Sequence, residues 1–125
     1  MGTSVRMRAA ASHLALLRRA LERGSLIQAE AAARECGRID LDDALRFVLL
    51  LLRERDARYE RAALRWLGRV LVDNPGIGFE GARDAVRALE AFGGPDADVA
   101  RARLALVLRG AGEVRAARVL ERSPT

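Results

Sequence analysis

Lysine is absent from this sequence, and all 22 basic residues are arginine. Cysteine and histidine occur once each, as Cys36 and His13, and aromatic residues make up only 4% of the chain. A single cysteine cannot form an intramolecular disulfide, so cysteine usage favours a cytoplasmic protein. The excess of basic residues is modest, because 17 acidic residues leave a formal net charge of +5.

Groups suited to catalysis or metal binding are equally scarce. A nucleophilic Cys36 would need a base beside it, and His13 is the only histidine. The sequence has no glycine-rich phosphate loop, paired histidines, paired cysteines or Ser-His-Asp set. The acidic cluster of Asp40, Asp42 and Asp43 is better explained by helix capping and the helix dipole than by a metal. We therefore expect a protein that is not an enzyme and that uses no metal or cofactor.

Long apolar runs are missing as well. The longest spans only residues 47–52, whereas a membrane-spanning helix needs about 20 apolar residues. We therefore expect no membrane partner. Residues 1–21 contain arginine and no acid, as organellar transit peptides do, but they also fit an ordinary first helix. No small-residue cleavage site of the kind that ends a signal peptide follows them.

The residues that dominate the chain are alanine, leucine and arginine, all good helix formers. Apolar residues recur at helical spacing, and no alternating run of the strand type occurs. The sequence predicts an all-α fold with about seven helices in one domain over residues 1–122, and a frayed tail over 123–125. The predicted helices cover residues 5–23, 26–36, 41–55, 57–72, 79–92, 95–109 and 113–122.

Glycine and capping residues mark the ends of these helices. Ser25 and Gln28 have the spacing of a capping box, and Asp40 and Asp56 stand where helix N-caps are expected. The connections are short, so consecutive helices should pack as antiparallel hairpins. Two arrangements remain open at this point: a short solenoid of hairpins and a compact helical bundle.

Residues 40–75 resemble a tetratricopeptide repeat, a helical hairpin that recurs every 34 residues. Phe47 and Leu50 match large apolar positions of its first helix, and Ala63, Leu67 and Pro75 match the small, large and closing positions of its second. Two residues depart from the pattern, since the repeat has small residues where this chain has Leu51 and Val70. The resemblance implies a short solenoid whose last helix, over residues 113–122, covers the exposed end.

The helix predicted over residues 41–55 is apolar on nearly every side. Such a helix either lies at the centre of the fold or meets a partner. On the second interpretation, Phe47, Leu50 and Leu51 would belong to an interface with another protein or with a second copy of the chain. On the first, these side chains belong to the core.

The next helix carries four arginines on one face. Arg58, Arg61, Arg65 and Arg69 are spaced three and four residues apart, which places them along one side of a helix. A row of guanidinium groups can bind phosphates or carboxylates in a bidentate manner. The alternatives are a face in water, or pairing with acids of the following helix such as Glu80 and Asp84.

The function that fits these features best is a non-catalytic protein–protein interaction module, either an adaptor or a regulatory subunit. The seven candidate partner-binding residues are Phe47, Leu50, Leu51, Arg58, Arg61, Arg65 and Arg69. The alternative is a nucleic-acid-binding protein that uses the arginine-rich helix face, although the net charge is small for that role.

Overall fold

The protein is an all-α domain of helical hairpins, as the sequence predicts. The structure, a computed structural model, describes the backbone of residues 2–122 and the side chains of residues 8, 9 and 11–122. Within this part of the chain there are seven α-helices, one 3-10 helix and no strand. The predicted frayed tail over 123–125 lies outside the described residues. The elements in chain order are α1 (Gly2–Arg23), α2 (Leu26–Cys36), α3 (Leu41–Arg53), α4 (Tyr59–Asp73), η1 (Pro75–Ile77), α5 (Gly78–Ala91), α6 (Ala97–Gly110) and α7 (Val114–Arg122).

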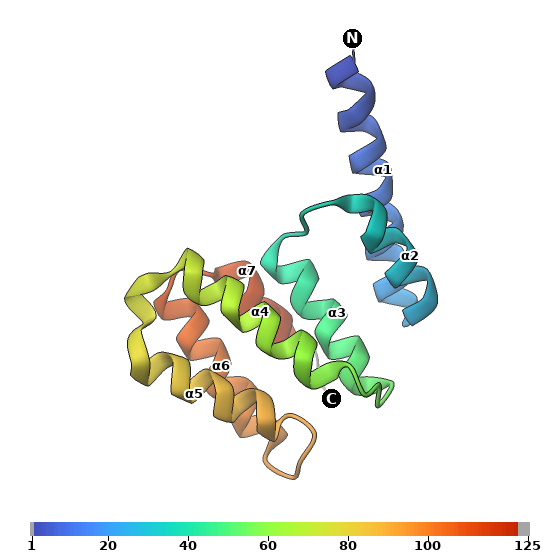
Figure 1. Cartoon of the computed structure of the whole chain (residues 1–125). Helices are drawn as coiled ribbons and strands as arrows, with labels where there is room; N and C mark the ends of the chain where they lie inside the picture. Colours follow the sequence, from blue (N-terminus) through green and yellow to red (C-terminus); the bar gives the residue numbers. More distant parts are fainter. Residues whose placement is uncertain (1, 123–125) are drawn as a thin grey trace.

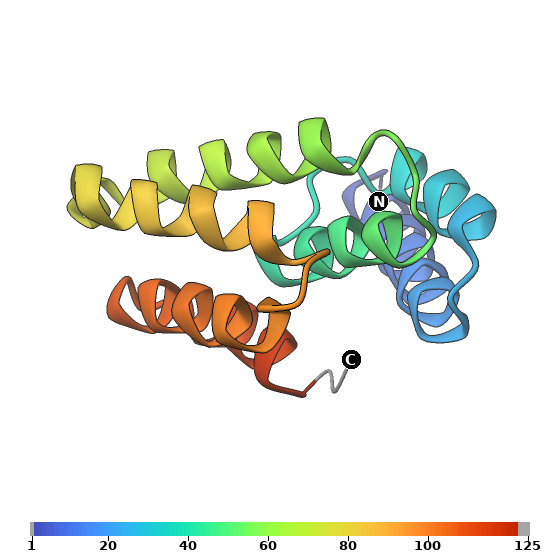
Figure 2. The same ribbon diagram turned by 90° about the horizontal axis from the view of Figure 1, so that it is seen from below.

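The helices pack as successive neighbours, and α3 makes two further contacts, with α1 and with α7. The α1–α2, α3–α4, α5–α6 and α6–α7 pairs make the most extensive contacts, and α7 also packs against α3. Figure 1 shows α3 to α7 as one group, with the α1–α2 hairpin beside it. Viewed from below, α4, α5 and α6 run side by side (Figure 2). The contact between α3 and α7 makes the C-terminal five helices compact.

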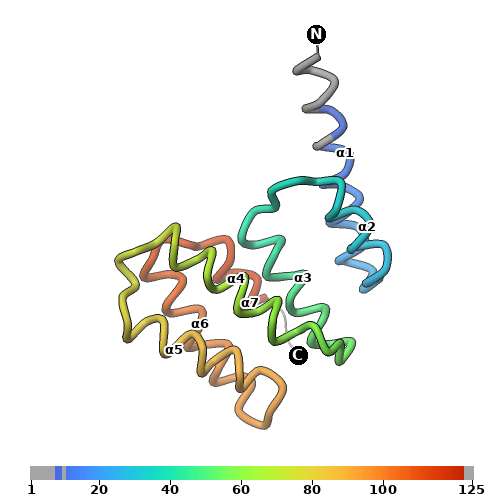
Figure 3. Tube along the Cα trace, viewed as in Figure 1, coloured from blue at the N-terminus to red at the C-terminus, as the bar shows by residue number. Residues whose placement is uncertain are grey.

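Two apolar clusters hold these helices together. The larger one joins α3, α4, α5, α6 and α7 and includes the buried side chains of Leu45, Trp66 and Leu104. The smaller one joins the α1–α2 hairpin to α3 and includes Leu17 and Leu50. Figure 3 shows the connection from α2 to α3, which passes from the hairpin to the start of α3. This connection forms one wall of the site described below.

Several helix ends differ from the predicted ones for local reasons. The third helix ends at Arg53 because Arg55 adopts a positive φ of 54°, outside the helical region. The fourth begins at Tyr59, after a turn in which the backbone N–H of Arg58 donates to the Asp56 carboxylate. The Ser25 hydroxyl caps α2 as expected. Asp40 occupies the predicted N-cap position of α3, but its side chain makes no cap hydrogen bond.

Candidate partner-binding surface

The apolar residues that were candidates for an interface lie inside the fold. Leu50 and Leu51 are buried, at 6% and 2% exposed. Phe47 is half-buried against the cluster between the α1–α2 hairpin and α3. The α1–α2 hairpin covers the side of α3 for which the sequence alone predicted no neighbouring helix. The interpretation of α3 as a central core helix is therefore correct, and Leu50 and Leu51 are unavailable to a partner.

Arg58 stands at the start of the arginine row and is held by acids of its own chain. Its guanidinium group forms ion pairs with Asp56, at 2.9 Å, and with Glu30 of α2. The side-chain hydrogen bond from Arg58, followed by the bond from its backbone N–H, lowers the pKa of Asp56 to about 2. The hydrogen bond to Asp56, and then that to Glu30, raises the pKa of Arg58. Arg58 thus ties α4 to the α1–α2 hairpin.

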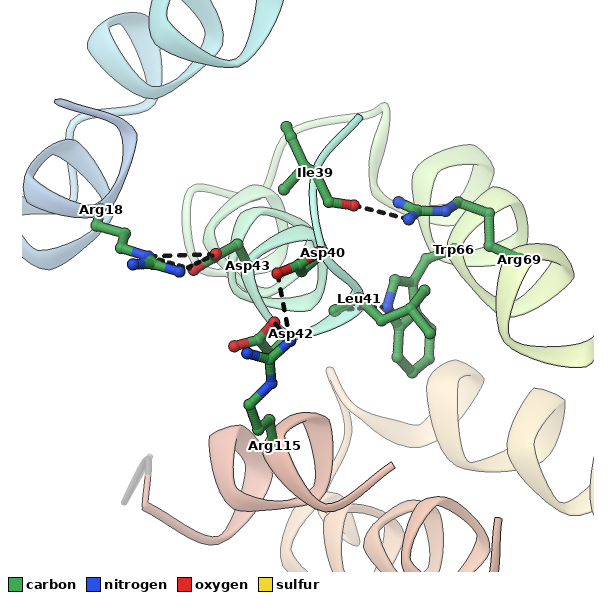
Figure 4. A network of polar contacts seen from close by, with 9 residues as sticks. All are labelled: Arg18, Ile39, Asp40, Leu41, Asp42, Asp43, Trp66, Arg69 and Arg115. Carbon is green, nitrogen blue, oxygen red and sulfur yellow. Dashed lines mark hydrogen bonds and ion pairs between the residues drawn. The ribbon is translucent and has the colours of Figure 1, made fainter. Parts of the chain in front are cut away.

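Arg69, at the other end of the row, also makes an internal contact. Its Nη2 atom donates to the backbone carbonyl of Ile39 at 2.7 Å, which links α4 to the α2–α3 connection (Figure 4). Nearby, the indole Nε1 of Trp66 donates to the carbonyl of Leu41 at 2.9 Å. Trp66 is only 2% exposed, so it is a core residue and cannot stack on a base.

Arg61 and Arg65, the two central members, differ from the outer two. Both side chains are exposed, and neither takes part in an ion pair within residues 8–122. Glu80 and Asp84 are exposed on α5 and form no ion pair with the arginine row in this part of the chain, so the pairing considered from the sequence does not occur. Two guanidinium groups therefore remain accessible on α4.

A shallow groove of about 830 Å³ lies between α4 and the α2–α3 connection, and of these two arginines Arg65 lines it. The α4 side of the groove contributes polar and apolar residues, with Gly68 between them. Its principal lining residues are Arg38, Ile39, Arg65, Gly68, Arg69 and Val72. Arg38 and Asp73, from opposite sides, form an ion pair at 3.6 Å. Val72 is an apolar side chain left 80% exposed.

The groove contains residues that the sequence alone did not single out. Gly68 and Val72 lie on the same face of α4 as Arg61 and Arg65, because helical residues seven and eleven positions apart are aligned. This spacing could have identified both residues from the sequence, because continuing the arginine row along the same face of α4 leads to Gly68 and Val72. Arg38 and Ile39 had no such signal, because only the folded chain brings them opposite α4.

The acidic cluster at the start of α3 is a junction between helices (Figure 4). The buried Asp43 carboxylate accepts hydrogen bonds from Arg18 of α1, the shortest at 3.1 Å. That hydrogen bond is the largest cause of the raised pKa of Arg18. Asp40 pairs with Arg115 of α7 at 3.2 Å, and Asp42 lies 3.8 Å from the same guanidinium group. Within the described residues no cluster of three or more acids, cysteines or histidines is arranged to hold a metal.

Cys36, the only thiol, is half-buried at the end of α2. Burial, and secondarily the charge of Asp43, raises the pKa of the Cys36 thiol. A raised pKa disfavours the thiolate, which is the nucleophilic form of cysteine. Its surroundings are therefore those of a structural cysteine.

Comparison of the chain with protein-family models, with curated proteins and with solved structures finds no match. Among the helices that the structure describes, none has the combination of length and apolar character required to cross a membrane. The fold and the groove on α4 therefore carry the functional interpretation.

Proposed function

We propose that this protein is a non-catalytic interaction module of the cytoplasm, an adaptor or regulatory subunit that binds another protein through the exposed face of α4. The observation that carries the proposal is the composition of that face. Arg61, Arg65 and the exposed Val72 lie along one side of the helix, beside an open groove. Mixed charged and apolar surfaces of this kind suit protein interfaces, where arginine is enriched. The resemblance of residues 40–75 to a tetratricopeptide repeat supports the same proposal.

A nucleic-acid-binding role, the second candidate, fits this face less well. Arg58 and Arg69 are engaged by the chain itself, which leaves two accessible arginines in the row. Trp66 and Tyr59 are held within the fold by hydrogen bonds to carbonyl groups and offer no platform for a base. Nucleic-acid affinity comes largely from many phosphate contacts, and two arginines supply few of them.

An affinity-capture experiment with a charge-reversal pair tests the proposal. Full-length tagged wild type, Arg65→Glu and Arg103→Glu are each used to capture proteins from a lysate of the source cell, with and without nuclease. Arg103 is a matched control, since it is exposed on α6 and forms no ion pair within residues 8–122. We expect the wild type to capture a protein whether or not nuclease is present. The Arg103→Glu variant should capture the same protein, and the Arg65→Glu variant should not. Retention of nothing by the wild type, or retention that nuclease abolishes, would contradict the proposal.

A further inference from the structure

Gly68 is unusual because it lies in the middle of α4 and nothing in its own chain requires a glycine there. A glycine inside a helix makes that helix less stable than an alanine at the same position would. Glycines are tolerated at such cost where a neighbouring group approaches too closely for a side chain. A Cβ atom added at Gly68 would meet no atom within 4 Å, so no internal packing accounts for this residue. The space over Gly68 opens onto the groove, which Gly68 lines together with Arg65 and Val72.

The residues along this face of α4 divide the face into a basic half and an apolar half, and of its two accessible arginines only Arg65 lines the groove. Arg61 and Arg65 precede Gly68 by seven and three positions, and the exposed Val72 follows it by four. At the far end, Asp73 is already matched by Arg38 across the groove. The unmatched charge is therefore positive and lies at the N-terminal half of α4. An occupant has to bring acidic groups to that half and apolar groups to Gly68 and Val72.

We infer that the α4 groove binds an acidic amphipathic helix of a partner protein, packed closely across α4 at Gly68. This inference rests on the proposed function and names the chemistry of the partner. A helix of about three turns matches this face of α4 in length, because residues 61–72 extend over about 16 Å at about 1.5 Å per residue. A small residue at a helix crossing lets the two backbones approach, since interaxial distance depends on the side chains at the contact. Carboxylates on the partner would accept paired hydrogen bonds from Arg61 and Arg65.

Three variants, Gly68→Gln, Arg65→Glu and Arg103→Glu, distinguish this binding mode from a purely structural role of α4. Gly68→Gln places a side chain at the groove, where a Cβ atom meets nothing in the chain, and glutamine is a good helix former. The variant should therefore fold while its groove is filled. Arg65→Glu reverses the charge of the basic half, and Arg103→Glu makes the same change in net charge on α6.

The experiment selects ligands for the full-length wild type from a displayed library of helix-forming peptides, and measures the selected peptides by fluorescence anisotropy. We expect them to carry two acidic residues three or four positions apart beside an apolar residue. Their affinity should fall about tenfold or more with Gly68→Gln and with Arg65→Glu, which corresponds to the loss of about 1.4 kcal/mol. Affinity for Arg103→Glu should be unchanged.

Four outcomes would overturn the inference. They are the absence of any selected peptide, selection of neutral or basic peptides, binding that survives Gly68→Gln, and a wild-type dimer in sedimentation equilibrium that Gly68→Gln dissociates.

The proposed function fails separately. If affinity capture from the lysate retains a protein that Gly68→Gln does not release, the interaction module stands and the acidic helix in the groove is wrong. Binding of single-stranded or duplex nucleic acid that Arg65→Glu abolishes would overturn both.

Discussion

Asp43 is the single buried charged residue among the described side chains, and its partner is only partly buried. The Asp43 side chain is 1% exposed, whereas that of Arg18 is 44% exposed. Such a pair is asymmetric, because a buried carboxylate without a partner is costly, while a half-exposed guanidinium group can be solvated. The asymmetry determines which of the two residues matters more for stability.

We expect Arg18→Ala to destabilise the protein more than Asp43→Ala does. Loss of Arg18 leaves a buried carboxylate unpaired and should lower the free energy of unfolding by about 3 kcal/mol. Loss of Asp43 frees Arg18 to reach water and should cost about 1 kcal/mol. Urea unfolding measures both, and Arg19→Ala, at an exposed neighbouring position, is the control. A larger loss for Asp43→Ala than for Arg18→Ala would contradict this account.

Replacement of Gly68 by alanine should stabilise the protein, in contrast to the same change at Gly81. At Gly68 the new methyl group meets no atom within 4 Å, so the helix gains up to about 1 kcal/mol. At Gly81 of α5 the added Cβ would lie 2.5 Å from Cγ2 of Ile77, which has to shift. Thermal or urea unfolding of the two variants gives the comparison. Equal stabilisation by both changes would show that contact with Ile77 has no cost.

At the level of the helices, sequence patterns placed the elements well because the signals are local. Gly24, Ser25 and Gly37 mark both ends of α2, and the observed bounds match the predicted ones. The end of α3 was missed by two residues, because the positive φ of Arg55 has no distinctive residue type behind it. Local patterns thus predict where helices lie, with errors at the ends.

The candidate site was only partly predictable, because its properties depend on which helices meet. The spacing of the α4 arginines was visible, but their division into engaged and accessible residues follows from contacts with Glu30 and Ile39 in distant segments. In the same way, the apolar surface of α3 gave no sign of whether a partner or the α1–α2 hairpin covers Leu50. Contacts between segments far apart in the chain leave no direct signal in a single sequence.

Tyr59 connects two elements, since its hydroxyl on α4 donates to the carbonyl of Leu89 on α5 at 2.7 Å. Burial raises the pKa of Tyr59 from 10.0 to about 12. The folded state therefore holds the proton more tightly than the unfolded chain does. This contribution to stability is complete below pH 10 and is lost as the pH rises towards 12.

The chain has one tyrosine and no lysine, a residue that would also titrate near pH 10. The titration of Tyr59 can therefore be measured directly. We expect the ultraviolet absorbance of tyrosinate to appear with a midpoint near pH 12 in the folded protein, and near pH 10 in urea. The free energy of unfolding of the wild type should fall between these pH values more steeply than that of Tyr59→Phe. Cys36 is present in both proteins, so its titration cancels from the comparison. The same midpoint in the folded and unfolded chains would contradict the burial of this hydroxyl.

On the scale of the whole molecule, the two apolar clusters divide the chain unequally. The larger cluster spans α3 to α7, and the α3–α7 contact joins the two ends of this segment. The α1–α2 hairpin depends on a small cluster, on the Arg18–Asp43 pair and on the Arg58–Glu30 pair. Fewer buried apolar contacts imply a smaller free energy of local opening.

We therefore expect the α1–α2 hairpin to open before the rest of the molecule unfolds. In native-state hydrogen exchange, amides of α1 and α2 should show lower opening free energies than those of α4 to α6. Leu17→Ala, at a side chain that is 1% exposed, should weaken protection of the hairpin by about 3 kcal/mol and leave α5 and α6 unchanged. Leu104→Ala, in the larger cluster, should instead reduce protection throughout the chain, because loss of that cluster unfolds every helix. If Leu17→Ala lowered protection of α5 and α6 as much as that of α1 and α2, the hairpin and the larger cluster would be a single cooperative unit, and the inferred order of opening would be wrong.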